Sequence, residues 1–140
     1  MKVSRTVAYA LHSVLQLAQA ERHTPVPCSR LAAAGEMPER FLLQILRSLV
    51  THGILVSTRG VDGGYRLERD PEEISLLEVI EAIDGPLNPV LPTVKGLPRE
   101  CKAKLECVIS DVTDFSRREL QAVKLAHLVS GGDGQRRDPK

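Results

Sequence analysis

The sequence predicts a mainly α-helical chain with one small β-hairpin, arranged as a winged helix-turn-helix domain plus a long C-terminal dimerisation helix. Apolar residues recur at steps of three and four along several segments, which is typical of amphipathic helices. Two such segments are separated only by Gly35-Glu36-Met37, a connection short enough for a helix-turn-helix. The next segment, GILVSTRGVDGGYRL (residues 53–67), has a glycine-rich centre between two short apolar runs, which indicates a β-hairpin wing.

Residues 1–85 are expected to form the DNA-binding domain, and local signals mark where its helices begin and end. Ser4 is a suitable N-cap, Gly35 a suitable C-cap, and Pro38 suits the first turn of a helix. A capping box of Ser75 and Glu78 starts the last helix of the domain. The expected helices span residues 4–19, 29–34, 38–52 and 75–83, and the expected wing strands span residues 54–56 and 65–67.

The C-terminal part is expected to consist of a proline-rich, cysteine-containing loop (86–104), a dimerisation helix (105–128) and a disordered tail (129–140). Val108, Val112 and Phe115 give the dimerisation helix an apolar face at three- and four-residue steps. A winged helix of this size cannot bury so long a helix by itself. Pairing with a second copy would bury it, and dimers with helix-turn-helix domains bind two-fold DNA sites, so we expect a homodimer.

Composition narrows the class of protein. A chain of 140 residues with 42% apolar and 26% charged residues fits one globular domain. Aromatic residues make up only 3%, which disfavours stacking on single-stranded nucleic acid. No apolar run approaches the length of a membrane span, and the first segment is expected to be an amphipathic helix rather than a signal peptide. Three cysteines, an odd number, favour a reducing cytoplasm over a disulfide framework.

Charge is unevenly distributed along the chain. The net charge is +1, but residues 1–70 carry +3, residues 71–100 carry −4 and residues 101–140 carry +2. A basic N-terminal part is compatible with binding double-stranded DNA, because each dimer presents two copies of the basic patch. The exposed face of the helix over 38–52 offers Arg40, Gln44 and Arg47, residue types that pair with base edges. Arg59 on the wing is a suitable probe for a phosphate or a minor groove.

Three segments, MKVSRTVAYAL, FLLQILRSLVTHGILVSTRGVDGGYRL and PEEISLLEVIEAIDGP, resemble the Rrf-two family of bacterial winged-helix transcriptional regulators, of which IscR, NsrR and CymR are typical. The resemblance covers most of residues 1–128 and implies a cytoplasmic homodimer that binds promoter DNA. The DNA-contacting positions that it implies or that the helix and wing offer are Glu39, Arg40, Phe41, Gln44, Arg47, Ser57, Arg59 and Gly60. Leu43 stands where iron–sulfur members often carry a glutamate, so the operator is expected to differ from theirs.

The resemblance also implies a sensory site at the cysteines before and in the last helix. Cluster-binding relatives carry three cysteines there, whereas this chain has only Cys101 and Cys107. Some relatives share a 2Fe–2S cluster across the dimer with a histidine of the first helix, and His12 occupies that position, although the acidic position one turn earlier is Ala8. A fourth ligand is then needed from elsewhere. Cys28 is expected to be a small buried residue.

Other interpretations of these residues stay open. Cys101 and Cys107 could instead form a thiol or disulfide switch or have no role, and His12 could be an ordinary packed side chain. A regulator that senses a small molecule without a cluster is one alternative function, and a winged-helix protein–protein adaptor without DNA binding is another. An enzyme is not expected, because the chain shows no nucleophile with its base and no phosphate-binding glycine loop before a helix.

Overall fold

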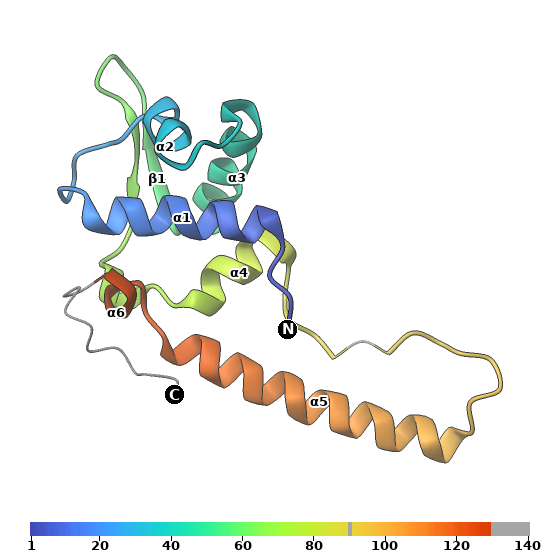
Figure 1. Ribbon diagram of the computed structural model, residues 1–140. Coiled ribbons are helices and arrows are strands. Elements are labelled where there is room, and N and C mark those ends of the chain that lie inside the picture. Colours follow the sequence, from blue (N-terminus) through green and yellow to red (C-terminus); the bar gives the residue numbers. More distant parts are fainter. Residues whose placement is uncertain (90, 130–140) are drawn as a thin grey trace.

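The computed structural model describes residues 1–89 and 91–129, and it has the predicted mainly helical architecture with a small antiparallel hairpin (Figure 1). In Figure 1, α2, α3 and the hairpin lie on one side of α1, α4 lies on its other side, and α5 runs beneath α4 with its first residues projecting beyond the rest. The elements are α1 (Arg5–Gln19), α2 (Cys28–Gly35), α3 (Glu39–Thr51), β1 (Leu55–Thr58), β2 (Gly64–Leu67), a 3-10 turn (Pro71–Glu73), α4 (Leu76–Asp84), α5 (Arg99–Ala122) and α6 (Leu125–Val129).

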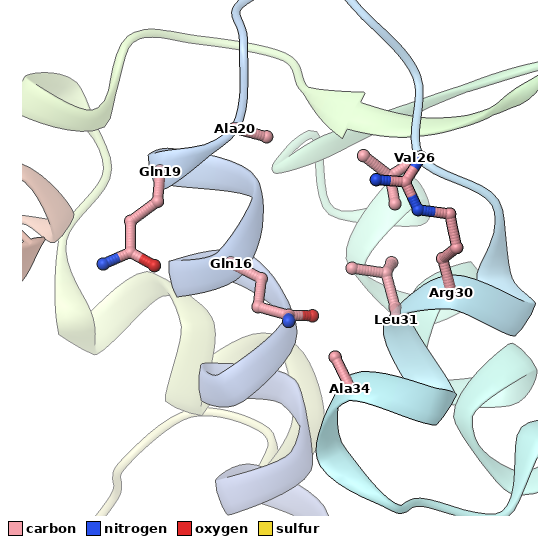
Figure 2. Close-up of a pocket in the computed structure, with 7 residues that line it drawn as sticks. All are labelled: Gln16, Gln19, Ala20, Val26, Arg30, Leu31 and Ala34. Atoms are coloured by element: carbon pink, nitrogen blue, oxygen red, sulfur yellow. The ribbon is translucent and has the colours of Figure 1, made fainter.

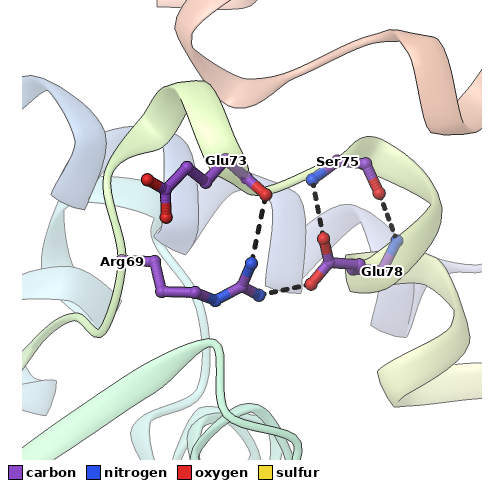
Figure 3. A network of polar contacts seen from close by, with 4 residues as sticks. All are labelled: Arg69, Glu73, Ser75 and Glu78. Carbon is purple, nitrogen blue, oxygen red and sulfur yellow. Dashed lines mark hydrogen bonds and ion pairs between the residues drawn. The ribbon is translucent and has the colours of Figure 1, made fainter.

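Both predicted N-terminal caps are confirmed. The Val7 N–H donates to the hydroxyl oxygen of Ser4 at 3.1 Å, which starts α1. At α4 the Glu78 N–H donates to Ser75 Oγ (3.1 Å) and the Ser75 N–H donates to the Glu78 carboxylate (3.2 Å), a complete capping box. The Arg69 guanidinium pairs with the same carboxylate and donates to the carbonyl of Glu73 (Figure 3). This network ties the segment that follows the wing to the start of α4.

The core is aliphatic, in keeping with an aromatic content of only 3%. The apolar stripe of α3 faces α1 and α4, and it consists of Leu42, Ile45, Leu46 and Leu49, each at most 3% exposed. Leu55 and Leu67, paired across the hairpin, close the core at the base of the wing. Leu125 of α6 is fully buried, which brings the C-terminal end of the described chain back onto α1.

The C-terminal helix differs from the predicted span of 105–128. It begins at Arg99, because the proline-rich stretch ends at Pro98, whose carbonyl accepts from the Lys102 N–H at 2.9 Å. It ends at Ala122, because Val123 leaves the helix: its carbonyl accepts from the Leu76 N–H at 2.8 Å. The predicted loop therefore loses its last six residues to the helix, and the predicted helix is two helices, α5 and α6. Of the predicted tail, residue 129 belongs to α6 and residues 130–140 lie outside the described part.

The two glycines at the end of the hairpin loop are required by close backbone approaches. A Cβ on Gly63 would lie 2.1 Å from the carbonyl oxygen of Thr58, and a Cβ on Gly64 would lie 2.4 Å from the carbonyl carbon of Val26. Gly64 also has φ +148°, a value that disfavours other residues. Val26 and Tyr65 exchange two backbone hydrogen bonds, at 2.9 and 2.8 Å. The base of the wing is thereby held against the segment that leads into α2.

None of the helices in the described residues is long and apolar enough to span a membrane.

Candidate nucleic-acid interface

One face of α3 is polar and exposed. Arg40, Gln44 and Arg47 are all exposed, and at 3.6 residues per turn they lie within about 60° of one another around the helix axis. The buried stripe of α3 occupies the opposite side. Three side chains with hydrogen-bond donors thus project from a helix that the core holds rigidly, an arrangement that can reach base edges in a major groove.

The connection between α2 and α3 depends on Met37, to which the sequence analysis assigned no role of its own. Gly35 was expected to cap α2, but it is the last helical residue, and Glu36 adopts the left-handed conformation (φ 53°, ψ 44°). Gly35 is constrained by space instead: a Cβ there would lie 2.7 Å from Met37 Cε and 3.0 Å from His12 Cε1. Met37 is buried, and its N–H donates to the Ala32 carbonyl at 2.8 Å, which fixes how α3 leaves α2.

The wing presents exposed backbone and side chains at its tip. Arg59 and Val61 are exposed, and within the described residues Arg59 makes no ion pair. Gly60 has φ +111°, a conformation that glycine adopts readily. Ser57 is exposed on β1, opposite Tyr65. The tip can therefore enter a groove without giving up any contact that the fold needs.

The α3 face and the base of the wing lie close together at Tyr65. Burial raises the pKa of the Tyr65 hydroxyl, and Cys28 raises it further, whereas the positive charge of Arg47 opposes the shift. α3 packs against β1, so its charged residues lie on the same side of the molecule as the base of the wing.

Two of the residues predicted to contact DNA have structural partners. The Phe41 ring is 38% exposed and packs edge-on against Tyr9 of α1, with the ring centroids 5.7 Å apart. The carbonyl oxygen of Glu39 accepts a weak hydrogen bond from the Cys28 thiol at 3.7 Å. Burial, and secondarily the charge of Glu39, raises the pKa of Cys28. Cys28 is half-buried, so it is more exposed than the fully buried residue that was expected. DNA contacts by Glu39 and Phe41 stay predictions.

The two C-terminal cysteines lie on different faces of one helix. Cys101 and Cys107 are both exposed on α5. A separation of six helical residues places them about 120° apart around the axis and about 9 Å apart along it. His12 lies on α1, with its ring against the end of α2. Among residues 1–89 and 91–129, no group of three or more His, Cys, Asp or Glu could hold a metal ion, so one chain does not assemble the predicted ligand set.

A cavity of about 260 Å³ lies between α1 and α2 (Figure 2). Figure 2 shows the amide of Gln16 directed from α1 toward Ala34 of α2, whereas Gln19 is directed away. Gln16 Oε1 is buried without a hydrogen-bond partner in the described chain. Arg30 lies at the edge of the cavity and forms no ion pair with any described residue. The cavity thus combines apolar walls with an amide and a guanidinium.

Comparisons with known proteins identify transcriptional regulators among the relatives of this chain. CymR of Bacillus subtilis, an HTH-type transcriptional regulator, is 30% identical over 135 residues, which cover 96% of this chain and 94% of CymR. The solved structure of CymR, described as the global cysteine regulator of that organism, superposes with a TM-score of 0.77 and 26% identity, covering 93% of this chain and 97% of that one. IscR of Vibrio vulnificus (strain YJ016), also an HTH-type transcriptional regulator, is 28% identical over 141 residues, covering 95% of this chain and 80% of IscR.

A candidate HTH-type transcriptional regulator of Mycobacterium tuberculosis (strain H37Rv), Rv1287, is 44% identical over 87 residues. That match covers 62% of this chain, and it spans only about half (54%) of the relative's length. A family model described as Rrf2, iron-dependent transcriptional regulator, matches residues 3–131. This match covers the helices, the wing and both C-terminal cysteines, and the chain therefore belongs to the Rrf2 family of transcriptional regulators.

Proposed function

We propose that this chain is a homodimeric transcriptional regulator that binds double-stranded promoter DNA through α3 and the wing. The observation that carries the proposal is the exposed polar face of α3, with Arg40, Gln44 and Arg47 opposite a rigid apolar stripe. Arginine pairs bidentately with guanine, and glutamine with adenine, in the major groove. Arg59 on the wing would contact the adjacent phosphates or minor groove and set the register.

The exposed apolar seam of α5 supports the dimer. In the subunit none of the residues of α5 is buried. Four of them are large and apolar and still 43–59% exposed: Leu105, Val108, Val112 and Phe115. Their spacing of three, four and three residues places them in one stripe along the helix, which is the pattern of a helix that packs against a second helix. A second copy of α5 would cover this stripe and make a two-fold assembly, which matches the symmetry of DNA sites read by such dimers.

DNase I footprinting with a duplex selected from a random pool tests this function. The wild type should protect a site with two-fold symmetry, and Gln44→Ala should bind the same duplex at least tenfold more weakly without a change in thermal stability. Glu72→Ala is a control, because Glu72 is exposed on the 3-10 turn and belongs neither to α3 nor to the wing. Failure of the wild type to select any duplex, while it still binds a protein partner, would instead support the adaptor.

The sensory role of the cysteines is constrained by α5. An iron–sulfur cluster requires four protein ligands, chiefly thiolates, whereas Cys101 and Cys107 diverge by about 120°. The residues of one chain therefore do not fit a cluster. A disulfide between them is excluded while α5 stays helical, because their Cα atoms are then about 10 Å apart, beyond disulfide reach. The exposed thiols are available only to partners outside their own subunit.

A second candidate for the signal is a small molecule bound without a cluster, and the cavity between α1 and α2 favours it. Its Arg30 guanidinium would pair with an acidic group of a ligand, and Gln16 Oε1 would accept a hydrogen bond from a donor on the same ligand, next to the helix-turn-helix. The absorption spectrum of protein purified without oxygen separates the two signals. Visible absorption that Cys101→Ala abolishes would support a cluster shared between subunits, whereas a colourless protein that responds to ligand in a Cys101→Ala/Cys107→Ala variant would support the cavity.

A further inference from the structure

Both ends of the cysteine-bearing segment converge on one carboxylate, that of Glu81 on α4. Glu81 Oε2 accepts a hydrogen bond from the Leu87 N–H at 2.8 Å, where the proline-rich loop begins. The same oxygen pairs with the guanidinium of Arg117, in the C-terminal third of α5. The side chain of Glu81 is 23% exposed, so the pair is partly shielded from water. Cys101 and Cys107 lie on the stretch of chain between these two attachments.

We propose that Glu81 is a positioning residue that sets the angle of α5 on the DNA-binding domain, and through it the distance between the two α3 helices of the dimer. The proposal rests on the α5-mediated dimer described above. Glu81 lies on α4, which packs against α1 and α3. Movement of α5 relative to α4 is therefore movement of the dimer seam relative to the helix that reads DNA.

Only two polar attachments of α5 to the rest of the subunit lie in the described residues. One lies directly after its last residue, where Leu76 N–H donates to the Val123 carbonyl (2.8 Å) and Leu125 N–H of α6 donates to the Ile74 carbonyl (2.9 Å). The other is the pair of Arg117 with Glu81. α5 also packs against α4. Within that packing, the backbone bonds at Val123 act as the pivot, and the pair of Arg117 with Glu81 is the polar contact that sets the angle.

Rotation of α5 about Val123 moves its residues further the more distant they are from that residue. At 1.5 Å per residue, Arg117 lies about 9 Å from the pivot at Val123, and Val112 in the seam lies about 16 Å from it. A shift of about 1 Å at Arg117 therefore becomes about 2 Å at the seam. Cys101, about 33 Å from the pivot, would move by about 4 Å. Conversely, a displacement of the helix at Cys101 would be transmitted to Glu81 through its contacts with Leu87 and Arg117.

The test uses duplexes whose two half-sites are separated by the selected spacer or by a spacer one base pair longer, plus a duplex with a single half-site. One base pair changes the half-site separation by about 3.4 Å and rotates one half-site by about 35° relative to the other, so a dimer with a fixed α5 angle should bind the longer spacer more weakly. Wild type should discriminate between the two spacers by at least about tenfold. Glu81→Gln should reduce that discrimination at least threefold, while single half-site affinity changes less than twofold. Glu81→Arg with Arg117→Glu should restore the discrimination, because it re-forms the ion pair that holds α5, although the Leu87 N–H loses its acceptor.

Glu72→Gln is the matched control, since it removes an exposed carboxylate of the same domain and should leave discrimination unchanged. If Glu81→Gln discriminates between the two spacers as well as the wild type does, the inference is overturned. It is also overturned if the variant loses the same factor in affinity for the single half-site and for both spacers, because that result indicates only a structural role. Absence of any spacer dependence or dimer in the wild type would refute the proposed function itself, and this inference with it.

Discussion

Arg59 is exposed at the tip of the wing and forms no ion pair with the described residues, so its removal should affect DNA binding without affecting the fold. We predict that Arg59→Ala weakens DNA binding and makes it less dependent on salt. A lysine or arginine that neutralises one phosphate contributes about −0.9 to the slope of log K against log salt concentration. Each dimer carries two copies of Arg59, so the slope should become less steep by about 1.8.

This slope converts into a difference that binding assays can measure. Between 50 and 200 mM salt, a fourfold range, a slope difference of about 1.8 corresponds to a factor of about 12 in affinity. The loss caused by Arg59→Ala should therefore be about 12-fold larger at 50 mM than at 200 mM salt. Arg59→Lys retains the charge and should keep the wild-type slope.

Fluorescence anisotropy with the footprinted duplex, titrated at four or five salt concentrations, measures this slope. Arg99→Ala is the matched control, because Arg99 is also an exposed arginine but starts α5, far along the chain from the wing. Its slope should equal that of the wild type. Equal slopes for Arg59→Ala and wild type would refute a phosphate contact by the wing, and an equally reduced slope for Arg99→Ala would show that only total charge matters.

Three further predictions concern assembly, stability and thiol chemistry. Val112→Glu places a charge in the apolar seam of α5 and should shift the dimer to monomer in sedimentation equilibrium. The helical content measured by circular dichroism should be retained, because Val112 is 59% exposed within the subunit. A dimer that persists would show that this stripe of α5 is not the dimer interface. Leu46→Ala shortens a fully buried side chain of α3 and leaves a cavity, so it should lower the free energy of unfolding by about 2–5 kcal/mol in urea titrations. A loss below about 1 kcal/mol would show that the neighbouring side chains fill the cavity. Burial raises the pKa of Cys28, so less of its thiolate is present at neutral pH, and iodoacetamide should modify it more slowly than the two exposed cysteines of α5. Its rate of modification should still rise at pH values where the rate of an ordinary thiol has levelled off. Mass spectrometry measures the three rates, and equal rates would contradict this prediction.

Much of the fold could be predicted because its signals are local. The three- and four-residue period of α3 placed its buried stripe on one side, and therefore its polar face on the other. Ser4 and Ser75 cap their helices through residues only three positions away, so the caps are readable from the sequence. The hairpin followed from glycines between two apolar runs. In each case the deciding interaction joins residues that are close along the chain.

The features that the sequence left open depend on contacts between distant residues. The periodicity of α5 continues past Val123, but bonds to the segment around Leu76 take that residue out of the helix. Gly64 is required because Val26 passes beside it, which no local pattern of the wing reveals.

The winged helix, the polar face of α3 and the number of cysteines near the last helix could be derived from the amino-acid sequence, because periodicity, capping and residue counts need no three-dimensional information. The tertiary structure was needed to show that Val123 leaves the helix and that Leu87 and Arg117 meet at Glu81. These arrangements are set by how helices pack. Packing joins residues separated by tens of positions, and a linear pattern does not contain those distances.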